Sequence, residues 1–190
     1  NSGTIVAHRG TVALASGETT TIDLAGDGMV RLAVTGDAGR DDAGVTNSGL
    51  IDAGGGRVVL SAGSAAGLLS AAINTSGVIR AASAEGAGGS IELVGRGAGA
   101  VRVAGNLDAS GATRGGSVTV TGQQVALAAT ARVAASGRDA GGSVRIGGDR
   151  QGQGTLRRAE TTTVEPGARI EAAARAGTGG SVIIWADQAT

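Results

Sequence analysis

The 190-residue chain contains no cysteine, phenylalanine, tyrosine or lysine, and only one proline, one methionine and one tryptophan. Without cysteine there is no disulfide framework and no thiolate metal site. Because Trp185 is the only aromatic residue, the core must be built from valine, isoleucine, leucine and alanine. Glycine, serine or a charged residue interrupts every apolar run well short of the ~18 residues that a transmembrane helix requires.

Charge of one sign is also lacking, since 16 arginines balance 16 aspartates and glutamates. A protein that binds nucleic acid normally carries an excess of basic residues, aromatic platforms for the bases, or both. This chain has neither, so we expect no nucleic-acid partner.

What the chain contains in abundance is glycine, with 37 residues, together with short apolar triplets that recur along its length. One recurring unit reads aliphatic, any residue, alanine. It occurs at 5–7, 51–53, 79–81, 107–109, 133–135 and 170–172. A second unit reads Gly-Gly-Ser-aliphatic-x-aliphatic, at 88–93, 115–120, 141–146 and 179–184, with a variant at 55–60. A less regular third unit falls at 22–24, 101–103, 125–127 and 162–164.

The outer residues of these triplets are small or apolar, whereas the middle residue is often polar, as at Glu92 and Thr119. This alternation is typical of a β-strand with one buried face. Ile51, Ile79 and Leu107 follow one another at intervals of 28 residues. Three short strands per interval, joined by glycine-rich corners, predict an all-β parallel β-helix, a solenoid of about seven three-strand coils. We interpret the 46 residues between Ile5 and Ile51 as two shorter coils.

The stacked coils should place like residues above one another along the helix. We expect inner ladders of isoleucine, leucine and valine, with alanine at the tight corners. The Gly-Gly pairs are expected to supply turns with positive φ, which other residues resist. Ser90, Ser117, Ser143 and Ser181 should stack as a polar ladder beside these turns.

The domain organisation expected from the sequence is one β-helix segment, residues 1–190, cut from a longer exoprotein, because the chain opens with Asn1 and neither end carries a cap. The interval from Val133 to Ile170 is 37 residues long, and the excess predicts a loop insertion at 147–161 outside the helix. A smaller excess lies between Leu60 and Ile73.

The chain resembles a known family in several runs of residues. These are Leu107-Asp108-Ala109-Ser110-Gly111, Gly142-Ser143-Val144-Arg145-Ile146-Gly147-Gly148-Asp149, Ile170-Glu171-Ala172 and Gly179-Gly180-Ser181-Val182-Ile183-Ile184-Trp185-Ala186-Asp187. They resemble the filamentous-haemagglutinin-like exoproteins of two-partner secretion. The opening residues 1–15 are similar to the part of such proteins near the end of their secretion domain. The resemblance implies a right-handed β-helix on the surface of, or secreted by, a Gram-negative bacterium, exported through an outer-membrane transporter partner and used in attachment, aggregation or biofilm formation.

Five residues are candidates for contact with a partner: Asp149, Arg157, Arg158, Ile183 and Trp185. Strand alternation places Trp185 outside the helix beside Ile183, where it would serve as a binding hot spot. The alternative is that the inserted loop, through Leu156, folds over Trp185 and closes a small core. Asp149 follows a Gly-Gly pair that resembles one copy of a calcium-binding repeat, but a single copy favours a turn in which Asp149 bonds nearby amides. Arg157 and Arg158 would meet acidic glycans or lipid headgroups, or remain solvated.

The function we expect is that of an adhesin segment, a rigid rod whose loops bind a glycan or protein receptor on a host surface or matrix. No catalytic, cofactor or metal site is expected. One alternative is a structural spacer or filament protomer that associates end to end. The other is an enzyme that degrades extracellular polysaccharides, for which two carboxylates such as Glu92 and Asp108 would have to approach each other.

Overall fold

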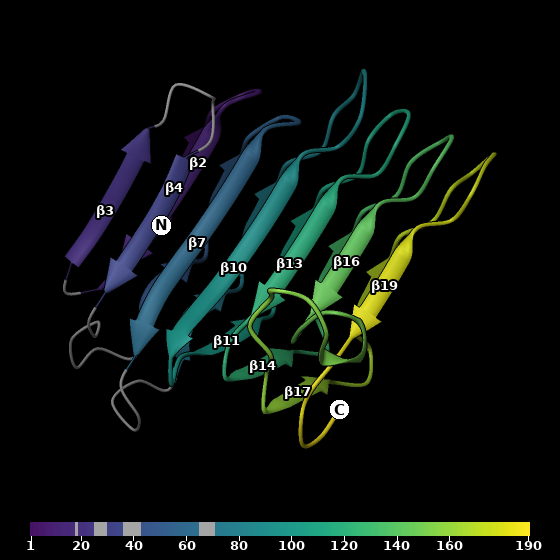
Figure 1. Cartoon of the computed structure of the whole chain (residues 1–190). Helices are drawn as coiled ribbons and strands as arrows, with labels where there is room; N and C mark the ends of the chain where they lie inside the picture. Colours follow the sequence, from purple (N-terminus) through teal and green to yellow (C-terminus); the bar gives the residue numbers. More distant parts are fainter. Residues whose placement is uncertain (18, 25–29, 36–42, 65–70) are drawn as a thin grey trace.

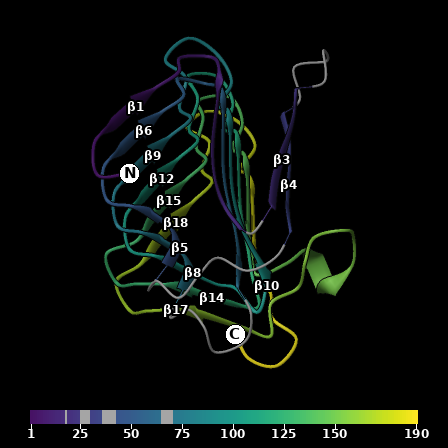
Figure 2. The same ribbon diagram turned by 90° about the vertical axis from the view of Figure 1, so that its left-hand side faces the viewer.

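A computed structural model of the chain describes residues 1–17, 19–24, 30–35, 43–64 and 71–190. It forms three parallel sheets that wind around a common core (Figures 1 and 2). Sheet 1 has the order β1 (Thr4–Val6), β6 (Leu50–Asp52), β9 (Val78–Arg80), β12 (Asn106–Asp108), β15 (Arg132–Ala134) and β18 (Arg169–Glu171). Sheet 2 has the order β2 (Thr11–Ser16), β7 (Arg57–Ser64), β10 (Ser90–Gly97), β13 (Ser117–Thr121), β16 (Ser143–Ile146) and β19 (Ser181–Ile184). Sheet 3 has the order β5 (Ala43–Asn47), β8 (Ala71–Thr75), β11 (Ala100–Val103), β14 (Gln124–Leu127) and β17 (Thr161–Val164).

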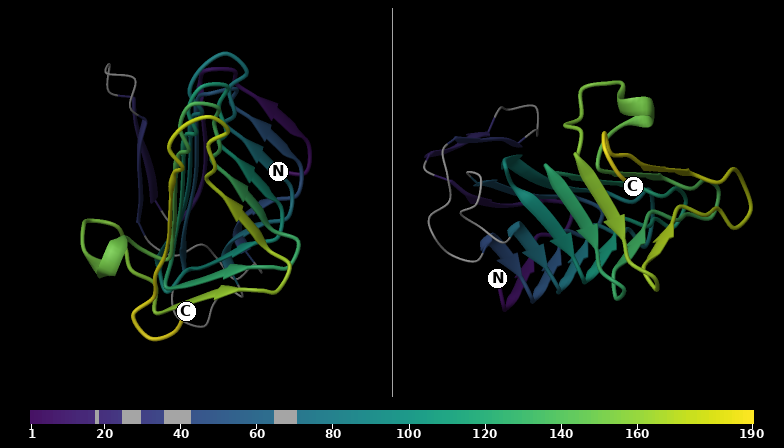
Figure 3. Two further views of the ribbon diagram at one scale, coloured as in Figure 1. Left: turned by 90° about the vertical axis from the view of Figure 1, so that its right-hand side faces the viewer. Right: turned by 90° about the horizontal axis from the view of Figure 1, so that it is seen from below.

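Successive turns of the chain, such as the turn of β6, β7 and β8, contribute one strand to each sheet in order, so the predicted parallel β-helix with three strands per coil is confirmed. The middle residues of the sheet 1 strands stand in one register and point inward. Ile51, Ile79 and Leu107 have no exposed surface, and neither do the alanines that follow them at the corner. Seen end-on, the three sheets surround this core as the sides of a triangle (Figure 3). A coil of so few residues cannot bury its aliphatic side chains alone, and stacking supplies the missing neighbours.

The number of coils is about six, so the expected seven is wrong at the N-terminal end. Ile5 pairs directly with Ile51, and Leu14 with Leu60. Much of the chain between them therefore does not form a coil. Instead it runs out into an antiparallel hairpin of β3 (Thr19–Leu24) and β4 (Val30–Thr35), which belongs to none of the three sheets. The triplet 22–24, expected as a third-sheet strand, lies in this hairpin, whereas 101–103, 125–127 and 162–164 do lie in sheet 3.

The Gly-Gly pairs serve a different purpose from the one expected. A Cβ added to Gly116 would lie 1.9 Å from the carbonyl oxygen of Gly89, and one added to Gly89 would lie 1.8 Å from that of Gly56. None of these three glycines has positive φ; in the early variant only Gly55 does, at 79°. The pairs are therefore glycines because backbones of successive coils approach closely here, and the expected positive-φ turn is wrong for them.

The serine ladder next to these glycines is confirmed by the strand register. Ser90 pairs with Ser117, which pairs with Ser143, which in turn pairs with Ser181. The excess length between Leu60 and Ile73 includes residues 65–70, which lie outside the described residues. Among the described residues, none forms a helix with the length and hydrophobicity that crossing a bilayer requires.

Candidate functional site

The chain between β16 and β17 runs outside the sheets and forms a loop that stands out beside sheet 2 (Figures 2 and 3). The loop carries the short 3-10 helix η1 (Arg150–Gly152). Its base is closed by the amide of Ala159, which donates to the carbonyl of Gly147 at 2.6 Å. The base is held between two other segments. The amide of Glu160 donates to Gln123 at 2.8 Å, and the amide of Asp187 donates to Ala159 at 2.9 Å. The loop thus leaves from and returns to a fixed position on the scaffold.

Asp149 sets the turn at the start of this loop. Its Oδ1 accepts a hydrogen bond from the amide of Arg150 at 3.0 Å and lies 3.3 Å from Nε of Arg145. The interpretation of Asp149 as a turn residue that bonds a nearby amide is therefore confirmed. Gly154, whose φ is 95°, follows close to the same carboxylate.

Trp185 lies directly after β19 and is half-buried beneath the loop. A Cβ added to Gly148 would lie 3.1 Å from Cδ1 of the indole, and one added to Gly152 would lie 3.1 Å from Nε1. The indole Nε1 donates to Oδ1 of Asp187 at 3.2 Å, and Oδ2 of Asp187 pairs with Arg158 at 3.3 Å. The structure thus supports the arrangement in which the loop folds over Trp185. The residues of the loop that approach the indole are Gly148 and Gly152, whereas the sequence suggested Leu156.

Arg157 points away from this cluster and toward β10. Its guanidinium donates to the carbonyl of Gly95 at 3.3 Å and to the carbonyl of Gly97. Burial lowers the pKa of Arg157, and the positive charge of Arg96 lowers it further, whereas the negative charge of Glu160 raises it. These carbonyls lie some sixty residues earlier in the sequence, in β10. The side chain of Arg157 therefore holds the loop against a strand that is distant in the sequence.

Ile183 is the last member of an outward column of sheet 2 in which it pairs with Arg145. It is half-buried, as is Arg145, whose guanidinium bonds Asp149. The structure therefore brings four of the five candidates into one neighbourhood. Arg145 links Asp149 to Ile183, since it pairs with the first through its side chain and with the second through the strand register. Asp187 links Arg158 to Trp185. The fifth candidate, Arg157, binds the carbonyls in β10 instead.

Sequence reasoning missed Arg145 and Asp187, which link the candidates. Both signals were present in the sequence. Arg145 and Asp149 are four residues apart across the end of a strand, and Asp187 follows Trp185 by two residues. No group of three or more histidine, aspartate or glutamate side chains that could hold a metal ion occurs in the part of the chain that the structure describes.

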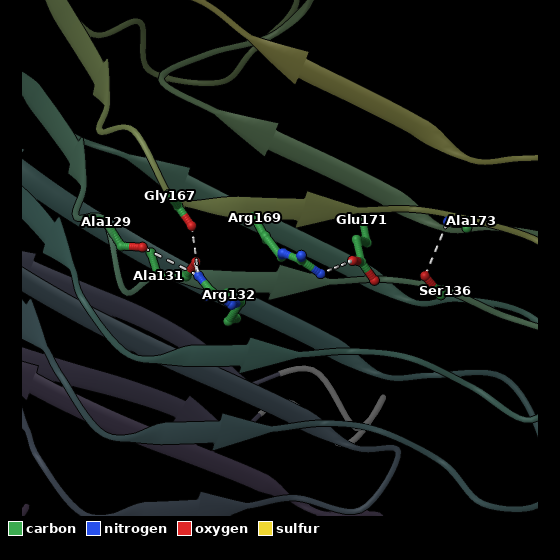
Figure 4. Close-up of polar contacts among 8 residues, drawn as sticks. All are labelled: Ala129, Ala131, Arg132, Ser136, Gly167, Arg169, Glu171 and Ala173. Atoms are coloured by element: carbon green, nitrogen blue, oxygen red, sulfur yellow. Dashed lines mark hydrogen bonds and ion pairs between the residues drawn. The ribbon is translucent and has the colours of Figure 1, made fainter.

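The last two coils are also tied together on sheet 1, a different side of the solenoid from the loop (Figure 4). Arg132 donates to the carbonyl oxygens of Ala131 at 2.9 Å and Gly167 at 3.0 Å. Arg169 lies 4.0 Å from Glu171 on the same strand. The bond from Arg132 to the carbonyl of Gly167 joins one coil to the next, whereas the pair of Arg169 and Glu171 lies within a single strand.

The fold and the stacked ladders define a β-helical solenoid with a displayed loop. Comparison with solved structures finds the crystal structure of the HMW1 secretion domain from Haemophilus influenzae, with a TM-score of 0.79 and 27% sequence identity. The match covers 98% of this chain and 47% of that one, so the chain spans about half the length of the secretion domain it matches. The predicted resemblance to the filamentous-haemagglutinin-like exoproteins of two-partner secretion is confirmed by this match. No protein-family model matches the chain, and no curated protein matches its sequence.

Replacing Arg157 with alanine should release the loop while leaving the coils folded. Hydrogen bonds from a charged donor contribute about 1.5 to 3 kcal/mol, so their loss should raise the rate of proteolytic cleavage within residues 148–158 by about tenfold or more. Limited proteolysis read by mass spectrometry measures this rate. Arg150→Ala is the control, because Arg150 is an exposed cation of the same loop whose side chain makes no hydrogen bond or ion pair to the described part of the chain. Equal cleavage of both variants would show that Arg157 does not hold the loop.

Proposed function

We propose that the chain is an adhesin-like, secreted β-helix segment that acts as a rigid rod and displays the β16–β17 loop, residues 147–161, for attachment. The observation that carries this proposal is the match to a secretion domain over nearly the whole chain. The same match supports export through an outer-membrane transporter partner and a location outside a Gram-negative cell.

The rod supports the mechanical part of this function. Parallel ladders run along the axis in all three sheets, so a load on the loop is shared by backbone hydrogen bonds of every coil. Arg157 and the base of the loop transfer such a load to β10 and β14, and not to a flexible hinge. A receptor bound at the loop would therefore be held at a fixed distance and orientation.

The loop supports the recognition part. Trp185 keeps part of its surface accessible beside Ile183, and Arg158 presents a half-exposed guanidinium above Asp187. A half-buried aromatic ring that is already held by Asp187 loses little conformational freedom on binding. We therefore place the contact with a host glycan or protein receptor at Trp185, Ile183, Arg158 and Asp149, with Arg157 as the residue that holds the loop in place.

A non-enzymatic role is favoured by the pairing of the outward acids. Glu92 is bonded by Arg57 at 3.0 Å, Asp52 lies 3.6 Å from Arg80, and Glu165 lies 3.8 Å from Arg102. A glycosidase needs two carboxylates that face each other across the substrate. Here the acids face arginines, as on a solvated, charge-balanced surface.

A spacer or filament protomer is the second candidate, and one observation favours it. Val164 and Val182 occupy inner-ladder positions, in register with Leu127 and Val144, yet 38% and 44% of their surfaces are exposed. Strands β17 and β19 are also the last strands of their sheets. A further coil, or a second copy of the chain, would cover these valines and pair with the outer edge of β19, whereas the edge of β17 already receives a bridge from Ala189.

The two candidates are separated by binding to immobilised host matrix proteins and glycans, compared with a variant in which residues 148–158 are shortened and Trp185 is replaced by alanine. We expect saturable binding that falls by about tenfold or more in the variant, as at an interface hot spot. Arg102→Ala, on sheet 3, is the matched surface control. Binding that is absent from the unchanged chain, with concentration-dependent growth of long particles in light scattering, would favour the filament protomer instead.

A further inference from the structure

The corner between sheet 1 and sheet 2 changes shape along the rod. In the first two coils this corner is a tight turn closed by one backbone hydrogen bond. The amide of Gly10 donates to the carbonyl of Ala7 at 2.8 Å, and the amide of Gly56 donates to the carbonyl of Ala53 at 2.9 Å. In the later coils the same corner is a longer arm, formed by residues 82–88, 110–115, 136–141 and 173–179. Figure 1 shows these arms projecting beyond the ends of β10, β13, β16 and β19.

The arms are stacked rigidly on one another. Ser83 and Gly111 form an isolated parallel β-bridge, and so do Gly137 and Ala174. The amide of Gly111 donates to the carbonyl of Ser136 at 2.9 Å, and the amide of Gly137 donates to that of Ala173 at 2.9 Å. A wall whose backbone groups are already paired keeps its shape when a ligand arrives, so a binding surface beside it is preformed.

Two cavities lie along this wall, of about 720 and 640 Å³. The first lies where the tight corners give way to the arms, between His8 and Arg9 on one side and residues 82–87 on the other. The second continues along the arms as far as Glu171 and Arg175. Both are lined by Ala82, Ser83 and Ala84, so they form one open trough that follows the axis of the rod from the first coil to the last. We call it the corner trough.

A row of hydroxyl groups stands along the corner trough at Ser83, Ser110 and Ser136. Each Oγ accepts a hydrogen bond from a backbone amide. The amide of Gly86 donates to Ser83 at 3.1 Å, and the amide of Ser136 donates to Ser110 at 3.3 Å. The amide of Ala173 donates to Ser136 at 3.1 Å (Figure 4). Because each oxygen is used as an acceptor, the hydroxyl proton is left to donate to a ligand. The row therefore offers donors at intervals of one coil.

The charged groups of the trough leave two arginines available as donors. Four arginines line it: Arg9, Arg80, Arg138 and Arg175. Asp139 accepts from Arg138 at 2.7 and 3.1 Å, and Asp52 lies 3.6 Å from Arg80. Arg9 and Arg175 are therefore the two lining arginines without a side-chain partner among the described residues. Asp52 also accepts from the amide of Gly54 at 3.0 Å, and Glu171 lies beside Arg169. Glu85 is the one acid of the lining without a hydrogen-bond or ion-pair partner among the residues that the structure describes.

We propose that the corner trough binds an extended anionic polysaccharide whose charged groups are carboxylates. Such a polymer presents acceptors along its whole length, which matches a trough of hydroxyl and guanidinium donors. Arg9 and Arg175, the lining arginines without a side-chain partner, stand at the two ends of the trough, on the first and the last coil, with the serine row between them. The trough is lined by no aromatic residue, so charge and hydrogen bonds decide its specificity rather than ring stacking. This site is separate from the β16–β17 loop and does not depend on the attachment proposed there.

The test is calorimetric titration of the whole chain with polygalacturonate, with neutral dextran and single-stranded DNA as comparison polymers. We expect binding to polygalacturonate to weaken by about tenfold or more in the double variant Arg9→Ala, Arg175→Ala, because charge-assisted bonds are lost at both ends of the trough. The double variant Arg102→Ala, Arg150→Ala carries the same change of net charge on surfaces outside the trough. It should bind within about twofold of the unchanged chain. Circular dichroism confirms that each variant is folded.

Two further variants give the proposal its sharpest outcomes. Glu85→Gln removes an acid from the lining and should tighten binding, whereas a purely structural role for Glu85 would leave it unchanged or weaken it. The variant with the shortened 148–158 loop should bind polygalacturonate as the unchanged chain does, which separates this site from the attachment site. Equal weakening by both arginine pairs, or equal binding of DNA and polygalacturonate, would overturn the proposal, as would equal binding of dextran.

Discussion

Gly116→Ala is expected to destabilise the protein severely. The new Cβ would lie 1.9 Å from the carbonyl oxygen of Gly89 and 2.8 Å from that of Gly88, both backbone atoms of the coil below. These atoms cannot move aside without breaking the ladders on either side of them. We expect a loss of about 3 kcal/mol or more, a large part of the stability of a typical domain, and a fall in Tm of about 6 to 12 °C. Thermal denaturation followed by circular dichroism measures it.

Gly179→Ala is the matched control, because Gly179 is the first glycine of the last Gly-Gly pair. A Cβ added there would meet nothing within 4 Å. The Tm of this variant should stay within about 1 °C of the unchanged chain, as for a surface substitution. If both substitutions lowered Tm equally, a general preference of these corners for glycine would explain the motif, and the close approach of the coils would not.

Ile146→Ala is the second substitution with a large expected effect. Ile146 has no exposed surface and stands in the inner ladder between Val120 and Ile184. Removing its side chain leaves a cavity in a core that has no aromatic residue to fill it. The expected loss is about 2 to 5 kcal/mol. Denaturation by urea gives the free energy of unfolding, and hydrogen exchange shows which coils open.

Ile184→Ala removes the same atoms one coil further along the same ladder. Ile184 is only half-buried, because it belongs to the last strand of sheet 2. The loss should therefore be smaller, about 1 to 2 kcal/mol. Since the two sites differ in little but burial, a loss at Ile184 equal to that at Ile146 would contradict the ladder of stacked coils.

The sequence predicts the coils well because their signal is local and repeated. The inward positions at Ile51, Ile79 and Leu107 are visible as a period of two within a period of 28 residues. The same repeat predicts which strands pair, because like residues must lie above one another. The register of Ser90 with Ser117 and Ser143 follows in the same way.

The first coil could not be predicted, because its length alone does not distinguish two coils from one coil with an excursion. The pairing of Ile5 with Ile51 shows that there is one coil with an excursion, and no local sequence pattern indicates this pairing. The hairpin of β3 and β4 has the same alternation of residues as a coil strand, so the triplet 22–24 gives no warning that it pairs in the antiparallel sense.

The sequence points to the five candidate residues but not to their contacts. Trp185 is conspicuous as the only aromatic residue, and Asp149 follows a glycine pair that predicts a turn. The partners of Arg157 are carbonyl oxygens of Gly95 and Gly97, and any residue type carries a carbonyl. A bond to such a group cannot be inferred from side-chain chemistry, so the anchoring of the loop becomes visible only in the fold.

The most direct test of the account is a distance along the rod between two spin labels. The chain has no cysteine, so Val6→Cys with Glu171→Cys labels only the first and last strands of sheet 1. Val6 and Glu171 belong to one outward column and are separated by five coil steps, through Asp52, Arg80, Asp108 and Ala134. Pulsed electron paramagnetic resonance should give a narrow distribution near about 24 Å, about 5 Å longer than for the pair Asp52→Cys and Glu171→Cys. A difference of about 10 Å between the two pairs would restore a second coil before Ile51 and contradict the register, and a broad distribution would contradict the stacked helix itself.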